Sequence, residues 1–310
     1  MLGSHLSIAG GVHNALLEAD KLGCDCVQVF TANQRQWSPR PPDARQIELW
    51  HHHRAELGLE MIISHDSYLI NLASPDPAAH QRSVDALARE LERCHLLDIP
   101  YLVIHPGSHV GSGEAAGLER IIAALDALHE RLPHVRTVTC LEVTAGQGTS
   151  LGHRLEHLRQ IRDAASAPHR LAYCLDTAHL LAAGHDLGSA AATRRVLREV
   201  DRTLGLDLVK VIHINDSKTP LASRVDRHEH IGHGHIPLES FAVLMNHRRL
   251  QKVPKILETP KEDAPDGRPW DAINLKTLRD LRKRRRPAAP AAAPQPARGG
   301  KKPSRQAKKS

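Results

Sequence analysis

The sequence predicts a single parallel (β/α)8 TIM barrel over residues 1–280. Short β-rich runs alternate with longer amphipathic stretches along this part of the chain, and such alternation is typical of α/β folds with a parallel sheet. Eight units in about 280 residues match the usual length of a barrel. Polar side chains that can bind metal also stand at the ends of six runs. Only a closed ring of strands would gather those ends into one small volume.

The first element of each unit is a short β-rich run, and eight such runs are expected to be strands. They are Gly3–Ser7, Val27–Phe30, Met61–His65, Tyr101–His105, Thr137–Glu142, Ala172–Asp176, Val209–His213 and Lys255–Glu258. The alternative is an open, doubly wound sheet. That sheet needs fewer strands, and it would spread the strand ends along a line instead of a ring.

The second element of each unit is a helix. The stretches Ser83–Leu97, Gly117–Leu132 and Ala190–Leu204 carry apolar residues at i, i+3, i+4 and i+7, which predicts amphipathic helices. Asp43 and Ser83 are expected to be N-caps. No internal repeat beyond the alternation and no second folded domain are expected.

The last 30 residues, 281–310, differ from the rest in charge. They contain eleven Lys or Arg and no Asp or Glu, so the formal charge of +7 leaves residues 1–280 at −4. Pro and Ala fill most of the remainder, and such a segment cannot bury enough apolar surface to fold. We therefore expect a disordered basic tail. It is either a solvated tail or an electrostatic tether for a polyanion such as DNA.

Bulk composition narrows the class of protein. Hydrophobic residues make up 41% of the chain, which is enough for a substantial core, and no run is long and apolar enough to cross a bilayer. The N-terminus lacks a secretory signal pattern, so we expect a cytoplasmic protein. Five cysteines do not suggest a disulfide framework, and we expect them to be small packed residues.

Nine side chains that can bind metal lie at or after the predicted strand ends. They are His65, His105, Glu142, Asp176, His179, His213, Asp226, His228 and Glu258. Five imidazoles and four carboxylates without a thiolate suit zinc or a similar divalent ion. Nine ligands exceed the need of one ion, so the set predicts two or three ions. Clusters of this kind are used for displacements at phosphorus.

Single motifs within this set are weak when taken alone. Asp176 and His179 are three apart, which places them on one face of a helix, but an N-cap Asp with an incidental His is an equal alternative. Asp226 and His228 are two apart, which places them on one side of an extended loop. The run 51–53 consists of three histidines in a charged helical stretch, and it is more typical of solvated surface than of a metal site.

Seven segments in order along the chain resemble the endonuclease IV family of apurinic/apyrimidinic (AP) endonucleases. The resemblance runs from about Gly3 to about Leu281. The segments are Asn33–Trp37, His65–Leu72, His105–His109, Thr144–Gly148, His213–Lys218, Ser223–His228 and Leu257–Thr259. Each motif is modest, but seven in register, which contain six of the nine candidate ligands, are specific.

The resemblance implies three Zn²⁺ ions per chain, with Mn²⁺ as an alternative at some positions. By matching, the first ion would be held by His65, His105 and Glu142, with Glu142 bridging to the second. The second would be completed by Asp176, His213 and Glu258, and the third would be held by His179, Asp226 and His228. It further implies damaged duplex DNA as the partner, no organic cofactor, a monomer, and a place on the nucleoid.

The resemblance also implies that Arg35, Tyr68 and Leu69 insert into DNA at the damaged site. A guanidinium or a phenol ring can stack on exposed bases and fill the space of a missing base. The alternative is that Tyr68 and Leu69 only pack their loop.

The implied reaction is hydrolysis of the phosphodiester bond 5′ to an AP site. A hydroxide between the first two ions would attack, and the products would be 3′-hydroxyl and 5′-deoxyribose phosphate ends. Glu142 would be the bridge and the first residue to test. The chain departs from the family pattern at Val143, His233 and Pro237, and none of these is a candidate ligand.

Two other functions fit parts of the sequence. A metal-dependent sugar isomerase or epimerase on the same barrel would need only one or two ions and would leave the trio His179, Asp226 and His228 unexplained. A damage-binding protein with structural metal would also fit, although structural zinc sites are usually closed and Cys-rich.

Overall fold

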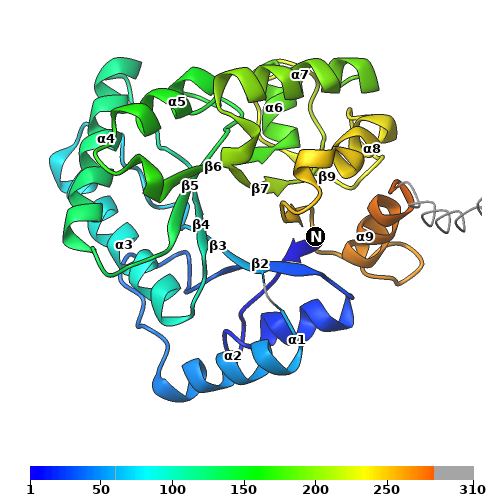
Figure 1. Ribbon diagram of the computed structural model, residues 1–310, viewed down its shortest axis with the longest axis horizontal. Coiled ribbons are helices and arrows are strands. Elements are labelled where there is room, and N and C mark those ends of the chain that lie inside the picture. The colour runs from blue at the N-terminus through cyan, green and yellow to red at the C-terminus, as the bar shows by residue number, and fades with distance from the viewer. Residues whose placement is uncertain (60, 283–310) are drawn as a thin grey trace, which may run out of the picture.

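The computed structural model describes residues 1–59 and 61–282. They form a closed barrel of parallel strands with helices on its outside (Figure 1), which confirms the predicted fold class. The strands in ring order are β1 (Leu2–His5), β2 (Cys26–Phe30), β3 (Met61–His65), β4 (Tyr101–Ile104), β5 (Val138–Glu142), β6 (Leu171–Asp176), β7 (Val209–His213) and β10 (Lys255–Leu257). The predicted tail falls outside the described residues apart from Leu281 and Arg282.

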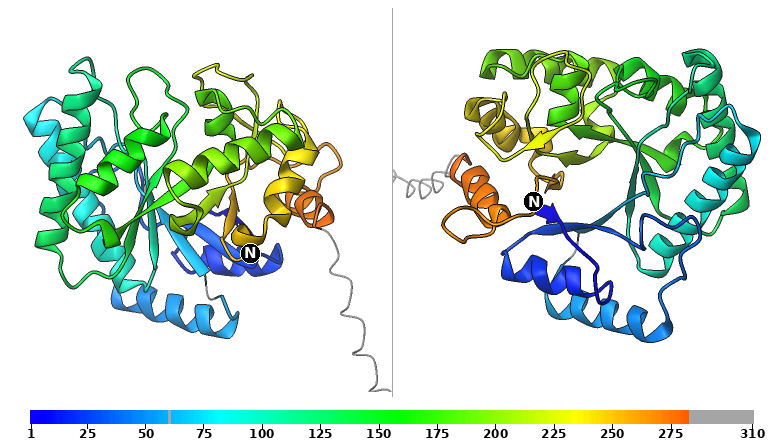
Figure 2. Two further views of the ribbon diagram at one scale, coloured as in Figure 1. Left: turned by 45° about the horizontal axis from the view of Figure 1, so that its top comes forward. Right: turned by 180° about the vertical axis from the view of Figure 1, so that it is seen from behind.

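The ring closes where β10 pairs with β1, with Leu2 opposite Lys255 and Ser4 opposite Leu257. Gly3 makes the contact between β1 and β2 close, because a Cβ there would stand 1.7 Å from the Cys26 carbonyl oxygen. The last helix of the described residues, α9 (Trp270–Asp280), lies beside the N-terminal strand β1 (Figures 1 and 2).

Helices follow the strands and cover the barrel. The others are α1 (Asn14–Lys21), α2 (Ala44–Glu56), α3 (Pro77–Leu96), α4 (Glu114–Arg131), α5 (Leu155–Ala164), α6 (Thr177–Ala183), α7 (Ala190–Thr203) and α8 (Leu238–Asn246), with 3₁₀ turns η1 (Pro168–Arg170), η2 (Leu206–Leu208) and η3 (Arg248–Leu250). No helix in the described ranges is long and apolar enough to cross a membrane.

The barrel interior is filled by a small apolar cluster that is separate from the larger layer between strands and helices. It consists of Cys26, Ile63, Val103, Cys140, Ala172, Cys174, Val211 and Ile256. Three of the five cysteines therefore pack inside the barrel, and all five are free thiols. This agrees with the expectation of packed cysteines without disulfides.

One predicted N-cap is confirmed and the other is wrong. The Asp43 carboxylate accepts a hydrogen bond from the Gln46 amide at 2.8 Å, and the Gln46 side chain bonds back, which completes a capping box. Helix α3 begins earlier than predicted, because Pro77 can start a helix and the Asp76 side chain caps the Ala79 amide. Ser83 lies inside that helix, where its hydroxyl bonds the Ala79 carbonyl.

Candidate metal centre

The side-chain period of a strand explains how the candidate ligands meet. Side chains two apart on a strand point the same way, and each interior apolar residue except Ala172 is followed two positions later by a polar one. The polar layer consists of Gln28, His65, His105, Glu142, Asp176, His213 and Glu258. This polar layer therefore lies directly above the small apolar cluster of the barrel interior, at the carboxyl ends of the strands.

Glu142 lies at the middle of this layer and is fully buried. Its Oε2 is 3.1 Å from His65 Nε2 and 3.2 Å from His105 Nε2. Its Oε1 is 2.8 Å from His213 Nδ1 and 3.3 Å from His179 Nδ1. The two oxygens thus face different imidazole groups, as a bridging carboxylate would.

A second group surrounds His213. Glu258 Oε2 is 3.1 Å and Asp176 Oδ2 is 3.9 Å from His213 Nδ1. Together with Glu142, these side chains offer four ligand atoms that lie within 4.8 Å of one another, a spacing at which they could hold an ion.

A third group stands at the rim. Asp226 Oδ2 is 3.1 Å from His179 Nε2, and Asp226 Oδ1 is 3.4 Å from His228 Nε2. His228 Nε2 is also 3.6 Å from Asp176 Oδ2. The structure thus brings all nine candidate ligands into one connected cluster.

Hydrogen bonds fix which nitrogen of each ring faces the cluster. The Nδ1 atoms of His65, His179 and His228 lie 2.9–3.0 Å from the backbone carbonyls of Asp66, Val143 and Glu258. A carbonyl oxygen only accepts, so each Nδ1 donates and each Nε2 presents a lone pair to the carboxylates. Since Val143 acts through its carbonyl, its apolar side chain does not disturb this arrangement.

His213 is held in the opposite sense. Gln28 donates from Nε2 to Glu258 Oε1 at 2.6 Å, which leaves its Oε1 to accept from His213 Nε2 at 2.8 Å. The Nδ1 lone pair of His213 then faces Glu142 and Glu258. Gln28 and His5, whose Nδ1 is 2.9 Å from Gln28 Nε2, are parts of the site that sequence reasoning missed.

Lone pairs that face carboxylates at these distances repel unless a cation or a proton stands between them. The buried Nε2 atoms of His179 and His228 have no hydrogen-bond partner, which is what the lone pairs of metal ligands would show. Five imidazoles and four carboxylates fit a borderline divalent ion. The residues present therefore fit a metal cluster.

The pKa shifts of His65 and Glu142 have the same cause, the close approach of imidazoles and carboxylates in the metal-free cluster. Burial alone would lower the pKa of His65, but hydrogen bonds to Asp66 and Glu142 raise it well above its usual value. Burial would raise the pKa of Glu142, yet the charges of His213 and His105 hold it well below its usual range. Without metal, protons would take the place of the cations.

Polar side chains outside the nine hold the ligand loops. Asn215 donates from Nδ2 to Asp176 Oδ2 at 2.7 Å and accepts from the Glu258 amide at 2.7 Å. The Asp216 carboxylate accepts from the amides of Gly232, Gly234 and Ile236 at 2.9–3.0 Å. These bonds hold the segment that follows the strand pair β8 (Asp216–Ser217) and β9 (His228–Glu229).

The predicted DNA-contact residues lie on loops around this mouth. Arg35 and Tyr68 are exposed and Leu69 is half-buried, with Tyr68 exposed by 72%. The Tyr68 ring is 6.3 Å from the His65 ring. Trp37 and Val110 are also exposed, so the loops after the neighbouring strands β2, β3 and β4 each present an apolar side chain to solvent.

The loop that carries Arg35 is anchored to α3 by a buried network. Thr31 lies at its base, 2.5 Å from Glu90 Oε2 and 2.9 Å from Arg93 Nε. Arg93 also pairs with Glu90 at 2.5 Å.

On the other side of the mouth, a cavity of about 440 Å³ is bordered by His105, Asp226 and the loop 144–150.

Comparisons with known proteins agree with this architecture. The family model of the xylose isomerase-like TIM barrel matches residues 16–283. Probable endonuclease 4 of Geobacter sulfurreducens is 47% identical over 284 residues, which cover 92% of this chain and 95% of the relative. The same-named protein of Chloroflexus aurantiacus is 44% identical, with coverage of 90% and 97%.

Solved structures are similar at two levels. The crystal structure of endonuclease IV from Thermus thermophilus matches with a TM-score of 0.78 and 37% identity, covering 90% of this chain and 98% of that one. A D-psicose 3-epimerase structure matches with a TM-score of 0.62 at 15% identity, covering 89% of each chain. The second likeness shows the fold alone.

Proposed function

Since the chain belongs to the endonuclease IV family, we propose that it repairs DNA by cutting the phosphodiester bond 5′ to AP sites in duplex DNA. Family membership makes the chain a DNA-cleaving hydrolase. The bond that is cut, the ends that are left (3′-hydroxyl and 5′-deoxyribose phosphate) and the metal are our proposals. We further propose that it works as a monomer on the DNA of the cytoplasm.

The observation that carries the proposal is the set of fixed imidazole lone pairs that face the carboxylates of Glu142 and Asp226. We propose three zinc ions, held by the three groups around Glu142, His213 and Asp226. Bound zinc would activate water near neutral pH and withdraw charge from the phosphate. Glu142 would join the first two groups, because a carboxylate has two oxygens and can span neighbouring ions.

The loops around the mouth would select the damaged nucleotide. Arg35, Tyr68 and Leu69 would enter the duplex and stack on or replace bases. A nucleotide without its base has lost its stacking and pairing, so extruding it costs less than the few kcal/mol needed for an intact one. The cavity beside His105 and Asp226 would give the extruded sugar and phosphate room next to the cluster.

The test combines metal content with cleavage of a defined duplex. The purified chain should contain about three zinc ions and should nick a duplex with one AP site, leaving an end that a DNA polymerase extends. Glu142→Ala should lose about a hundred- to a thousandfold in rate, as losses of a central electrostatic group do. The control is Glu130→Ala, an exposed carboxylate on the outer helix α4.

Three outcomes would contradict the proposal. Nicking by Glu142→Ala at the wild-type rate would remove the role of the bridge. Turnover of a ketose sugar without nicking of DNA would instead support the isomerase or epimerase alternative, and tight binding of zinc-replete protein without nicking would support a damage-binding protein.

A further inference from the structure

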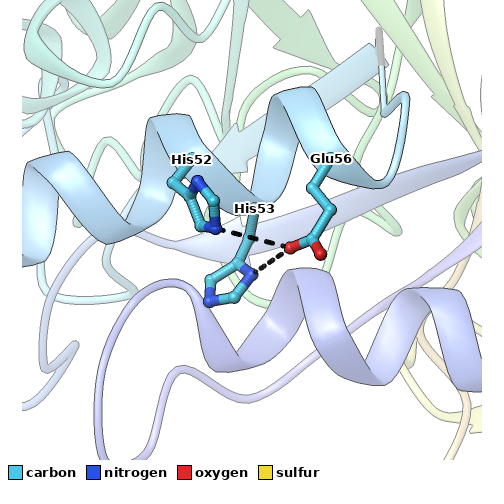
Figure 3. A group of neighbouring side chains, drawn as sticks. All are labelled: His52, His53 and Glu56. Atoms are coloured by element: carbon cyan, nitrogen blue, oxygen red, sulfur yellow. Dashed lines mark hydrogen bonds and ion pairs between the residues drawn. The ribbon is translucent and has the colours of Figure 1, made fainter.

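Away from the barrel mouth, one more group of metal-binding side chains comes together within the described residues. It consists of His52, His53 and Glu56 on the outer helix α2 (Figure 3). We propose that these three side chains bind a divalent transition-metal ion such as Zn²⁺, Ni²⁺ or Cu²⁺.

The distances match those of a coordination site. His52 Nε2 is 3.6 Å and His53 Nδ1 is 3.2 Å from the same oxygen, Glu56 Oε2, and both rings turn toward that carboxylate in Figure 3. Ligand atoms around a tetrahedral ion with bonds of about 2.0–2.1 Å stand roughly 3.4 Å apart. The three ligand atoms lie within 4.8 Å of one another, so only small rotations of the side chains are needed.

The helix places the three ligands on one face, and its neighbour holds His53 in place. Residues three and four apart share one face of a helix, which is the spacing of His53 and His52 from Glu56. The His53 ring also stacks on His13, with centroids 5.5 Å apart and planes at 19°. Because His13 directly precedes α1, His53 is fixed between two helices, whereas His52 and Glu56 are exposed by 65% and 58%.

The donor set decides between metals. Two imidazole nitrogens and one carboxylate oxygen suit zinc, nickel and copper, whereas Mg²⁺ and Ca²⁺ prefer sites built from oxygen. Water can fill the remaining positions, because the site is open. The alternative is that these side chains form only solvated ion pairs on a helix surface. The run of three histidines at 51–53, taken by itself, favours that alternative. That alternative predicts no preference for transition metals.

The site lies far from the candidate centre. Helices of a (β/α)8 barrel run opposite to the strands, so the end of α2 lies near the start of the next strand, β3 at Met61. A metal there would clip the last turn of α2 and leave cleavage of DNA unchanged.

The test measures extra metal on the zinc-replete full chain. In equilibrium dialysis against Zn²⁺, the wild type should hold one ion more than His53→Ala. Glu56→Gln keeps the size of an exposed side chain, so it should fold normally and weaken the extra site at least tenfold. The matched control is His51→Ala on the same helix, whose ring lies near the Leu96 carbonyl and outside the group. It should retain the extra ion, and Mg²⁺ should not compete.

Equal zinc content in the wild type, His53→Ala and Glu56→Gln would overturn the proposal, as would effective competition by Mg²⁺. Nicking of an AP-site duplex should be the same in wild type and Glu56→Gln. Absence of nicking in both would sink the proposed function and leave the α2 site untouched, so the two failures are distinguishable.

Discussion

Lys255 is an almost fully buried lysine at the start of β10. Its Nζ donates to the carbonyls of Leu250 and Val253 at 2.6 and 3.1 Å. Burial, with a smaller contribution from Arg282, lowers its pKa to about 8 from an ordinary value of 10.5. The charge of this residue therefore makes folding depend on pH.

The sign of that dependence follows from proton counting. Between pH 8 and 10.5 the unfolded chain holds the Lys255 proton and the folded chain has lost it, so stability rises with pH. Relative to Lys255→Met, the wild type should gain about 3 kcal/mol in free energy of unfolding across that window. Urea unfolding at several pH values measures it, and Lys252→Met at an exposed position is the control. A constant difference between wild type and Lys255→Met would contradict the shift.

Val110 is strained as well as exposed. Its φ is +45°, a left-handed conformation that a β-branched residue rarely adopts. Val110→Gly should raise the free energy of unfolding by about 1 kcal/mol, because glycine pays no steric cost there. Val110→Ala keeps a Cβ and should gain less. Thermal unfolding of the three proteins tests the ranking, and destabilisation by glycine would refute it.

The residues of the candidate centre could be predicted, because the strand period and the family motifs each identify single positions in the sequence. Six of the nine ligands end predicted strands and three follow them, and the structure gathers all nine in one place. Gln28 was missed, although a polar residue inside the predicted run Val27–Phe30 was a usable signal. Asn215 and the carbonyl partners of the histidines could not be predicted, because those contacts depend on how separate loops pack.

At the scale of elements, the buried pair of Glu90 and Arg93 links α3 to the loop that follows β2. Arg93→Met should cost about 3–5 kcal/mol, because it leaves a buried carboxylate without its partner. The double variant Glu90→Leu with Arg93→Met should recover most of that loss. A urea-unfolding cycle of the four proteins measures the coupling, and additive losses would show that the pair does not act as a unit.

Strand positions were predicted well and helix starts less well, for physical reasons. A buried strand is a short apolar run with clear ends, and β3 and β7 have the predicted bounds. The start of α3 depends on the Asp76 cap and not on the first apolar residue. The pair β8 and β9 has two residues in each strand, which is too short to show any period in sequence.

At the scale of the whole molecule, positive charge is concentrated in the segment after Arg282, whereas residues 1–280 carry a net charge of −4. That segment contains all the basic residues of 281–310 except Arg282, which lies 3.7 Å from Asp25. Truncation after Arg282 should make the affinity for undamaged duplex less dependent on salt, by about 0.9 in log–log slope for each phosphate that the segment neutralises. Binding titrations at several salt concentrations measure the slope. If it does not change, the tether hypothesis fails and the solvated-tail alternative stands.

The pairing of β1 with β10 has a consequence for the chain as it is made. Ser4 and Leu257 are neighbours across the closure although they lie 253 positions apart. A ribosome adding about 5–20 residues per second needs roughly 13–50 s to cover that span. During that time β1 has no partner on the edge that later pairs with β10. Glu258, the last proposed ligand, has also not been made. An unfinished chain therefore lacks both the closed barrel and one proposed ligand, so we expect it not to cut DNA.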